Sequence, residues 1–264
     1  MKIIIGVLTY PRDYSDKTYN SLKRTFDSLV KNVDLRSHTI KVLVIGDDYN
    51  NIESLSPIFE GYDVSFFNIN VNDALRNKHI PGDIIWFYAC VRSVQTLFEK
   101  ALEMADSYDY LLLSSDDDEY INNKLTTSID YIHRYKNPDL IYSLGIYRKG
   151  RIMPHTYNKK TLELNYPLPE NVIAAGMLYN LKNTAFIQDI IQFRAQQYQK
   201  LLQYIEAANF KQIGPDNLFP EDAQLWHYLQ PQFKSKKYRS LLIPEVLVNH
   251  DTEKTVLNYI AHKN

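Results

Sequence analysis

Apolar residues recur along the first half of the chain in two patterns that alternate with each other. Nearly continuous apolar runs predict buried strands at residues 2–8, 40–45, 64–69 and 110–114. Apolar residues spaced three or four positions apart predict helices at residues 15–33 and 91–105. Strands that alternate with helices form parallel sheets through right-handed crossovers. The first half is therefore expected to form a nucleotide-binding type of α/β sheet.

The second half of the chain is less regular. A strand at residues 140–147 is expected to pair with a strand at 151–157 through the turn at 148–150. Further elements are predicted at 173–179 (a strand of small residues), 184–205 (a helix capped by Thr184), 220–229 (a short helix) and 241–248 (a strand). No repeat or long linker divides the chain, so one domain is predicted across all 264 residues.

Three consecutive aspartates, Asp116, Asp117 and Asp118, come just after the apolar strand predicted at residues 110–114. Ligands of α/β sheets bind beyond the carboxyl ends of the strands. In an extended chain Asp116 and Asp118 face one way and Asp117 the other. Two carboxylates about 4 Å apart repel by roughly 4 kcal/mol at a protein surface, and a divalent cation removes that repulsion. Oxygen ligands favour Mn²⁺, Mg²⁺ or Ca²⁺ over zinc. An acidic turn solvated by water is the alternative interpretation.

Other polar residues stand at predicted strand ends, where a base or a ribose would lie. Thr9, Tyr10 and Arg12 follow the first strand, and Asp47 and Asp48 follow the second. Either set can hydrogen-bond a uracil base or ribose hydroxyls, and either set is equally typical of a turn.

Three further side chains are candidates for contact with a diphosphate or a metal. Arg92, on the helix before the aspartates, either faces a diphosphate or lies on a solvated helix surface. Lys254, near the end of the chain, is a second diphosphate candidate. His250 ends the last predicted strand, where a histidine is either a metal ligand or a polar residue with ordinary hydrogen bonds.

An acidic pair, Glu221 and Asp222, follows Pro220 at a predicted helix start. A carboxylate held there by backbone donors can accept the proton of an acceptor hydroxyl, which makes Asp222 the candidate general base. Glu221, about 100° away around the helix, is better placed to cap the helix or to orient a side chain. A plain acidic first turn is the alternative.

The order of these motifs resembles that of the GT-A fold glycosyltransferases, and their finer pattern resembles the β3-galactosyltransferase and Fringe branch. The resemblance implies a Rossmann-like mixed sheet in three αβα layers, with a nucleotide-sugar-binding half (1–122) and an acceptor-binding and catalytic half (123–264). It implies that the aspartate triplet is the DxD motif and that Glu221 and Asp222 are the catalytic motif. Metal ligands implied by it are Asp116, Asp118 and His250, for Mn²⁺ or Mg²⁺, with Asp116 and Asp117 also contacting the nucleotide. Gly176 and Met177 would belong to an acceptor loop.

Composition narrows the choice of partner and compartment. The net charge of −1, from 30 basic and 31 acidic side chains, gives no support to a nucleic-acid partner. The single cysteine, Cys90, excludes an internal disulfide and a cysteine-based zinc site. No apolar run approaches the length of a membrane span or a secretory signal. The named branch usually resides in a secretory lumen with disulfides, so we expect a cytoplasmic microbial or viral relative, with peripheral membrane attachment left open.

These observations predict a metal-dependent glycosyltransferase that moves a sugar from a nucleotide diphosphate, with UDP favoured, to a hydroxyl of a glycan or glycoconjugate. Inversion is favoured because Asp222 permits direct displacement by the acceptor. One alternative is a sugar-phosphate nucleotidyltransferase, although the glycine-rich signature of that class is missing after the first strand. A second alternative is a non-catalytic cation- or carbohydrate-binding domain, in which the aspartates hold Ca²⁺.

Overall fold

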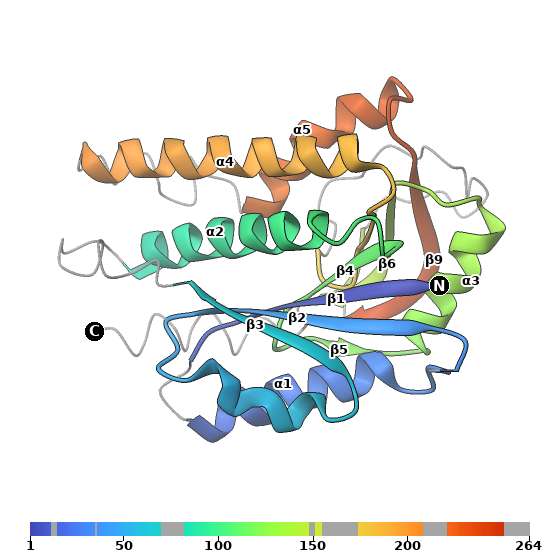
Figure 1. The fold of residues 1–264 in the computed structure, drawn as a ribbon. Coiled ribbons are helices and arrows are strands. Elements are labelled where there is room, and N and C mark those ends of the chain that lie inside the picture. The colour runs from blue at the N-terminus through green and yellow to red at the C-terminus, as the bar shows by residue number, and fades with distance from the viewer. Residues whose placement is uncertain are drawn as a thin grey trace.

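One mixed sheet forms the centre of the chain (Figure 1). A computed structural model describes residues 1–11, 15–34, 36–69, 82–147, 151–154, 174–207 and 221–250, without the side chains of 15–17, 82–88 and 221–223. The strands are β1 (Lys2–Thr9), β2 (Thr39–Asp47), β3 (Asp63–Ile69), β4 (Tyr110–Ser114), β5 (Glu119–Tyr120), β6 (Leu140–Tyr147), β7 (Arg151–Met153), β8 (Leu178–Asn180) and β9 (Ser240–Asn249). Their order across the sheet is β3-β2-β1-β4-β8-β6-β9-β5, with β7 beside β6.

The sheet changes direction in its middle. Strands β1 to β4 pair in parallel, β8 is antiparallel to both β4 and β6, and β9 is parallel to β6. The chain leaves β1 toward β2 on one side and later returns to add β4 on the other. That reversal places the topological switch point, where α/β sheets bind ligands, between β1 and β4. The same sheet crosses from the first half of the chain into the second.

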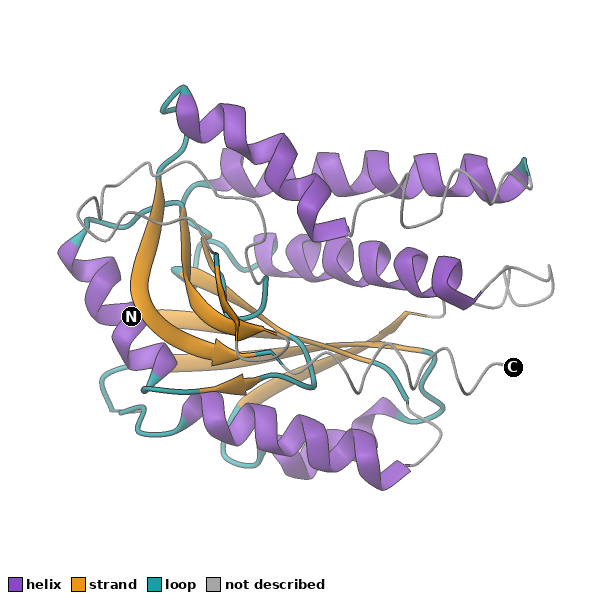
Figure 2. Ribbon diagram, turned by 180° about the vertical axis from the view of Figure 1, so that it is seen from behind, coloured by secondary structure: helices purple, strands orange, loops and turns teal. Residues whose placement is uncertain are grey.

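Helices cover both faces of the sheet, giving three layers (Figure 2). One face carries α1 (Ser15–Val30), the 3₁₀ helix η1 (Ile52–Phe59) and α3 (Lys124–Arg134). The other face carries α2 (Gly82–Leu102), α4 (Thr184–Glu206) and α5 (Glu221–Lys234). Alternate residues of β1 serve the two cores, because Ile3 and Ile5 pack on the α1 side and Ile4 on the α2 side.

Close packing explains a glycine in β1. A Cβ atom built on Gly6 would lie 2.5 Å from the side chain of Leu97. Helix α2 therefore lies directly against β1, and a larger residue at this position would push the helix away from the sheet.

Most predicted elements are confirmed, and the differences are local. Strand β7 pairs antiparallel with β6 as predicted but ends at Met153. The cap of α4 is Asn183 and not Thr184, since the Asn183 side chain accepts the N–H of Phe186 at 3.2 Å. The sequence pattern missed η1, α3 and β5.

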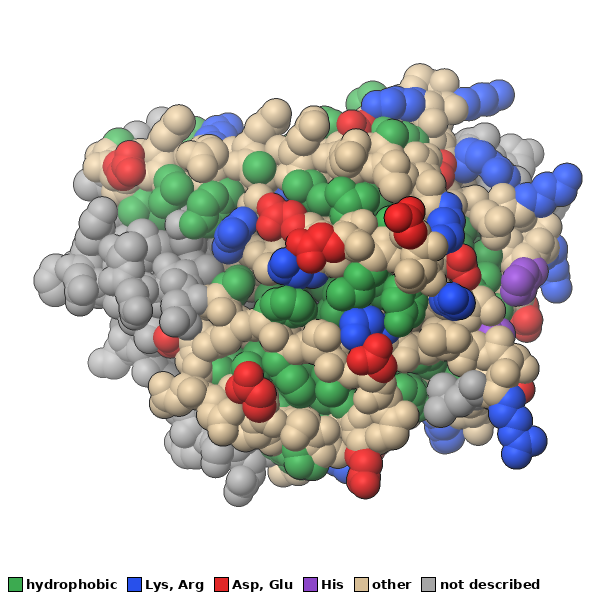
Figure 3. Space-filling view, in the orientation of Figure 1, with side chains coloured by type: hydrophobic (Ala, Val, Ile, Leu, Met, Phe, Trp, Pro, Cys, Tyr) green, Lys and Arg blue, Asp and Glu red, His purple; other side chains and the backbone are tan. Residues whose placement is uncertain are grey.

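The charges on the described surface agree with the nearly equal numbers of acidic and basic side chains in the sequence. On the face seen in Figure 3, acidic and basic side chains are interspersed over the helices. Within the described ranges, no helix combines the length and the apolar character that crossing a bilayer requires.

Candidate functional site

The aspartate triplet follows β4 at the switch point, but it does not continue the strand. Strand β4 ends at Ser114, and Ser115 to Asp118 form a bend before β5. The alternation expected of an extended chain therefore does not reach the triplet. Asp116 and Asp118 are both buried, and each carboxylate has its own set of partners.

Asp116 is bound toward the first two strands. The hydroxyl of Thr9, at the end of β1, donates to Asp116 Oδ2 at 2.8 Å. The same hydroxyl lies 2.7 Å from the hydroxyl of Tyr49, which follows β2. Thr9 is itself buried, and its hydroxyl contacts the side chains of both Asp116 and Tyr49. Tyr49 was not singled out in the sequence.

Asp118 is bound toward the last strand. Its Oδ1 lies 2.5 Å from Nδ1 of His250, and its Oδ2 accepts a hydrogen bond from the Ser115 hydroxyl. The Asp118 carbonyl accepts the hydroxyl of Thr25 in α1 at 2.6 Å. The side chain is 1% exposed, so this carboxylate is fully enclosed by polar partners.

His250 is oriented by β6. Its backbone N–H donates to the carbonyl of Ile146 at 2.8 Å. Its ring stacks on Tyr147, with centroids 5.6 Å apart and planes 12° from parallel. Pairing of β5 with β9 brings Glu119 opposite Asn249 and thereby places His250 beside Asp118.

Two of the three predicted metal ligands meet here. Asp118 and His250 supply an oxygen and a nitrogen, which suits a divalent cation. The two groups now face each other across a 2.5 Å contact, and a cation held by them would take the place of this contact. Asp116 is turned to Thr9, and no group of three or more His, Cys, Asp or Glu side chains among the described residues is arranged to hold a metal. In the described contacts Asp116 pairs with Thr9 and Asp118 with His250, and a role for Asp116 as a third metal ligand stays a prediction.

The other candidates at the strand ends have mixed outcomes. Asp47 is buried as the last residue of β2, and Asp48 has a left-handed backbone with φ 66°. Tyr10 is half-buried directly after β1. Arg92 lies 3.8 Å from Glu99 and over the ring of Tyr198, between α2 and α4, which supports its interpretation as a helix-surface residue.

The remaining predicted site residues differ in how much of them the structure describes. Arg12 and Lys254 lie outside the described residues. Glu221 and Asp222 form the start of α5, which confirms the predicted helix start, while their side chains lie outside the description. Met177 is fully buried in the core, so nothing in the described residues supports a contact between its side chain and an acceptor.

Gly176 lies beside β4 and packs against the side chains of Tyr120 and Lys124. Its N–H donates to the carbonyl of Leu113 at 2.7 Å, and its backbone has φ +74°. A Cβ atom here would lie 2.9 Å from the ring of Tyr120 and 3.0 Å from Cε of Lys124. The described contacts therefore give this glycine a packing role beside β4.

Gly176→Ala is expected to destabilise the protein by about 2–4 kcal/mol, the sum of left-handed backbone strain and overpacking. Gly61→Ala is the matched control, because Gly61 also has positive φ (+86°) but nothing within 4 Å of its Cβ position. Denaturant unfolding of both variants measures the difference. Equal losses of stability would show that the contacts with Tyr120 and Lys124 are irrelevant.

Lys124, at the start of α3, is a fully buried lysine that no sequence pattern indicated. It is completely inaccessible to solvent, and its Nζ donates to the hydroxyl of Ser143 at 3.0 Å. Burial lowers its pKa from the usual 10.5 to about 7. Beside it, burial raises the pKa of Tyr120 well above its usual value, and the Tyr120 hydroxyl donates to Ser114 at 2.9 Å.

The lowered pKa of Lys124 predicts how stability changes with pH. Between pH 7 and 10.5 the unfolded chain holds the proton of Lys124 more tightly than the folded chain, so this lysine makes stability rise with pH. Below pH 7 its full penalty applies. Lys124→Met should therefore stabilise the protein by about 3–5 kcal/mol at pH 6, and this gain should shrink toward pH 10.

Unfolding of the Lys124→Met variant at several pH values checks this prediction. Lys31→Met, at an exposed position after α1, should change stability little at any pH. A difference between Lys124→Met and the parent that is constant with pH would contradict the assignment.

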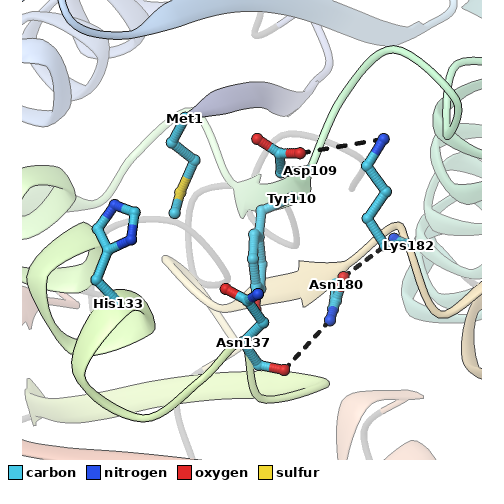
Figure 4. Close-up of a pocket in the computed structure, with 7 residues that line it drawn as sticks. All are labelled: Met1, Asp109, Tyr110, His133, Asn137, Asn180 and Lys182. Carbon is cyan, nitrogen blue, oxygen red and sulfur yellow. Dashed lines mark hydrogen bonds and ion pairs between the residues drawn. The ribbon is translucent and has the colours of Figure 1, made fainter.

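A pocket of about 360 Å³ lies at the other end of the parallel strands (Figure 4). Its polar groups are engaged with one another: Lys182 lies 4.0 Å from Asp109, and the Lys182 N–H donates to Asn180 at 3.0 Å. This pocket is distant along the strands from the aspartates and does not contribute to the site. It is lined by Met1, Asp109, Tyr110, His133, Asn137, Asn180 and Lys182.

Comparison with known proteins identifies the fold. No known protein family and no curated protein matches the sequence. S. aureus TarS, residues 1–349, matches with a TM-score of 0.54 and 14% identity over 96% of this chain and 61% of that chain. Its complex with UDP matches with a TM-score of 0.50 and 15% identity, over 95% and 60%.

The chain thus spans about three fifths of the length of these TarS structures. TarS is a GT-A-type glycosyltransferase, so the predicted GT-A-type mixed α/β fold is confirmed. The match does not single out the β3-galactosyltransferase and Fringe branch.

Proposed function

We propose that this chain is a glycosyltransferase that takes its sugar from a UDP-linked donor. The observation that carries the proposal is the contact between buried Asp118 and half-buried His250 beside the end of β4, in a GT-A-type fold. This is the edge of the sheet where α/β proteins bind their ligands. The similar TarS structure contains UDP, which supports uridine in the donor.

The proposed reaction is displacement at the anomeric carbon. The acceptor oxygen forms a bond to that carbon while the bond to the diphosphate oxygen breaks, and the electron pair leaves with UDP. The acceptor proton passes to a base, for which Asp222 in the first turn of α5 is our candidate. A base acting opposite the leaving group inverts the anomeric centre.

Asp118 and His250 are the residues that would hold a divalent cation, with Mn²⁺ or Mg²⁺ as candidates. A bound cation would neutralise the negative charge that develops on the departing diphosphate. The enclosed position of Asp118 supports this role, because a carboxylate that is shielded from water interacts strongly with a charged ligand.

Several finer features are part of the proposal. The sugar is a hexose or a pentose, and the acceptor is a hydroxyl of a glycan or glycoconjugate. Affiliation with the β3-galactosyltransferase and Fringe branch rests on the finer pattern of the sequence motifs alone.

A donor screen tests the proposal. The protein is incubated with UDP- and GDP-sugars and Mn²⁺, and release of the nucleoside diphosphate is measured. Release from a UDP-sugar is the expected result. Release of inorganic pyrophosphate from UTP and a sugar 1-phosphate would instead indicate a nucleotidyltransferase. Ca²⁺ binding that does not change when nucleotides are added would indicate a non-catalytic domain.

A further inference from the structure

Tyr49 is held in one position at the end of β2 by its neighbours. Its N–H donates to Asn68 Oδ1 at 3.0 Å, and Asn68 Nδ2 donates to the Tyr49 carbonyl at 2.6 Å. A Cβ atom on Gly46 would lie 2.7 Å from the Tyr49 ring, so only glycine at position 46 leaves room for the ring. Tyr49 is thereby held in place just after the carboxyl end of β2.

The hydrogen bonds around Thr9 run in one direction. A carboxylate only accepts hydrogen bonds, so the single hydrogen of the Thr9 hydroxyl goes to Asp116 Oδ2. The 2.7 Å contact between the Thr9 and Tyr49 hydroxyls then requires Tyr49 to be the donor. An ordered chain therefore runs from Tyr49 through Thr9 to Asp116, across the ends of β2, β1 and β4.

We propose that Tyr49 and Thr9 are positioning residues that orient the Asp116 carboxylate toward the nucleotide part of the donor. This inference rests on the proposed function. Asp118 and His250 form one unit, and Asp116 with its hydroxyl chain forms another that faces the first two strands. Because an ionised carboxylate has no hydrogen to donate, it suits a ligand group that carries N–H or O–H, such as a ribose hydroxyl or a base N–H. It repels a phosphate oxygen.

Calorimetric titration of UDP at a fixed Mn²⁺ concentration tests the proposal. Thr9→Val removes the donor to Asp116 and should weaken UDP binding by about 10-fold, the effect of one charge-assisted hydrogen bond. Thr9→Ser keeps the hydroxyl and should bind within about 2-fold of the parent protein. Tyr49→Phe loses only the outer hydroxyl and should weaken binding by about 3-fold.

Coupling distinguishes orientation of Asp116 from direct contact. In an Asp116→Asn background, Tyr49→Phe should have no further effect on UDP binding, because it acts only through that carboxylate. Tyr131→Phe is the matched control. Tyr131 lies on α3, outside the site, and its hydroxyl contacts Glu245 of β9 at 3.2 Å. The Tyr131→Phe variant should bind UDP as the parent protein does.

The outcomes separate this inference from the proposed function. If the parent protein binds UDP and both Thr9→Val and Tyr49→Phe bind it equally well, the hydroxyl chain is merely structural and the inference is overturned. An undiminished effect of Tyr49→Phe in the Asp116→Asn background also overturns it, because Tyr49 would then contact UDP itself. Failure of the parent protein to bind UDP overturns the proposed function and the inference together. Tyr49→Phe removes one oxygen atom and keeps the test decisive if Thr9→Val does not fold.

Discussion

The Asp118→Asn variant is expected to lose Mn²⁺-assisted UDP binding, with affinity reduced by at least about 100-fold, the scale on which disrupted metal sites fail. Asparagine keeps the volume of the side chain but removes the negative charge. The parent carboxylate is fully buried and lies 2.5 Å from His250. Without that charge, the site loses the negative oxygen ligand that a divalent cation prefers.

Asp130→Asn is the matched control, because Asp130 is exposed on α3 and the same charge is removed there. It should bind UDP and Mn²⁺ as the parent protein does. Thermal unfolding of both variants separates loss of binding from loss of folding. A folded Asp118→Asn variant with unchanged Mn²⁺-assisted affinity would show that Asp118 is not a metal ligand.

The second large effect is expected at the start of α5. Asp222→Asn should lower turnover by at least about 100-fold, the loss expected when a general base is removed. UDP binding should change little, because the base contacts the acceptor and not the nucleotide. Steady-state kinetics with the donor found in the screen, together with UDP titration, measure the two quantities separately.

Glu221→Gln provides the comparison for Asp222→Asn. Both substitutions remove one charge from the first turn of α5, so they weaken the helix to a similar extent. Glu221 is expected to cap or orient, so turnover of its variant should fall less than about 10-fold. Full turnover in Asp222→Asn, or equal losses in both variants, would refute the assignment of Asp222 as base.

The sheet was predictable from sequence because its strands are buried on both faces. Runs such as that of β4 are continuously apolar, and the helices between them show one apolar face. Elements that depend on tertiary packing were not predictable. Strand β5 has two residues and exists through its pairing with β9, and η1 contains Pro57 within a short apolar segment.

The candidate site could be predicted only in part. The aspartates and His250 were singled out from their places at strand ends and from motif order, although Asp118 and His250 are 132 positions apart. Tyr49 gave no signal, because its role depends on the register that brings β1, β2 and β4 together. Lys124 gave none either, since a lysine at a helix start is ordinarily exposed.

Titration of UDP into the protein, with excess Mn²⁺ and again with a chelator, tests the central claim most directly. That claim is that the Asp118–His250 corner binds a nucleoside diphosphate together with a divalent cation. Mn²⁺ is predicted to tighten UDP binding by at least about 100-fold, and UDP must then tighten Mn²⁺ binding by the same factor. Equal UDP affinity with Mn²⁺ and with the chelator, or no UDP binding in either condition, would contradict it.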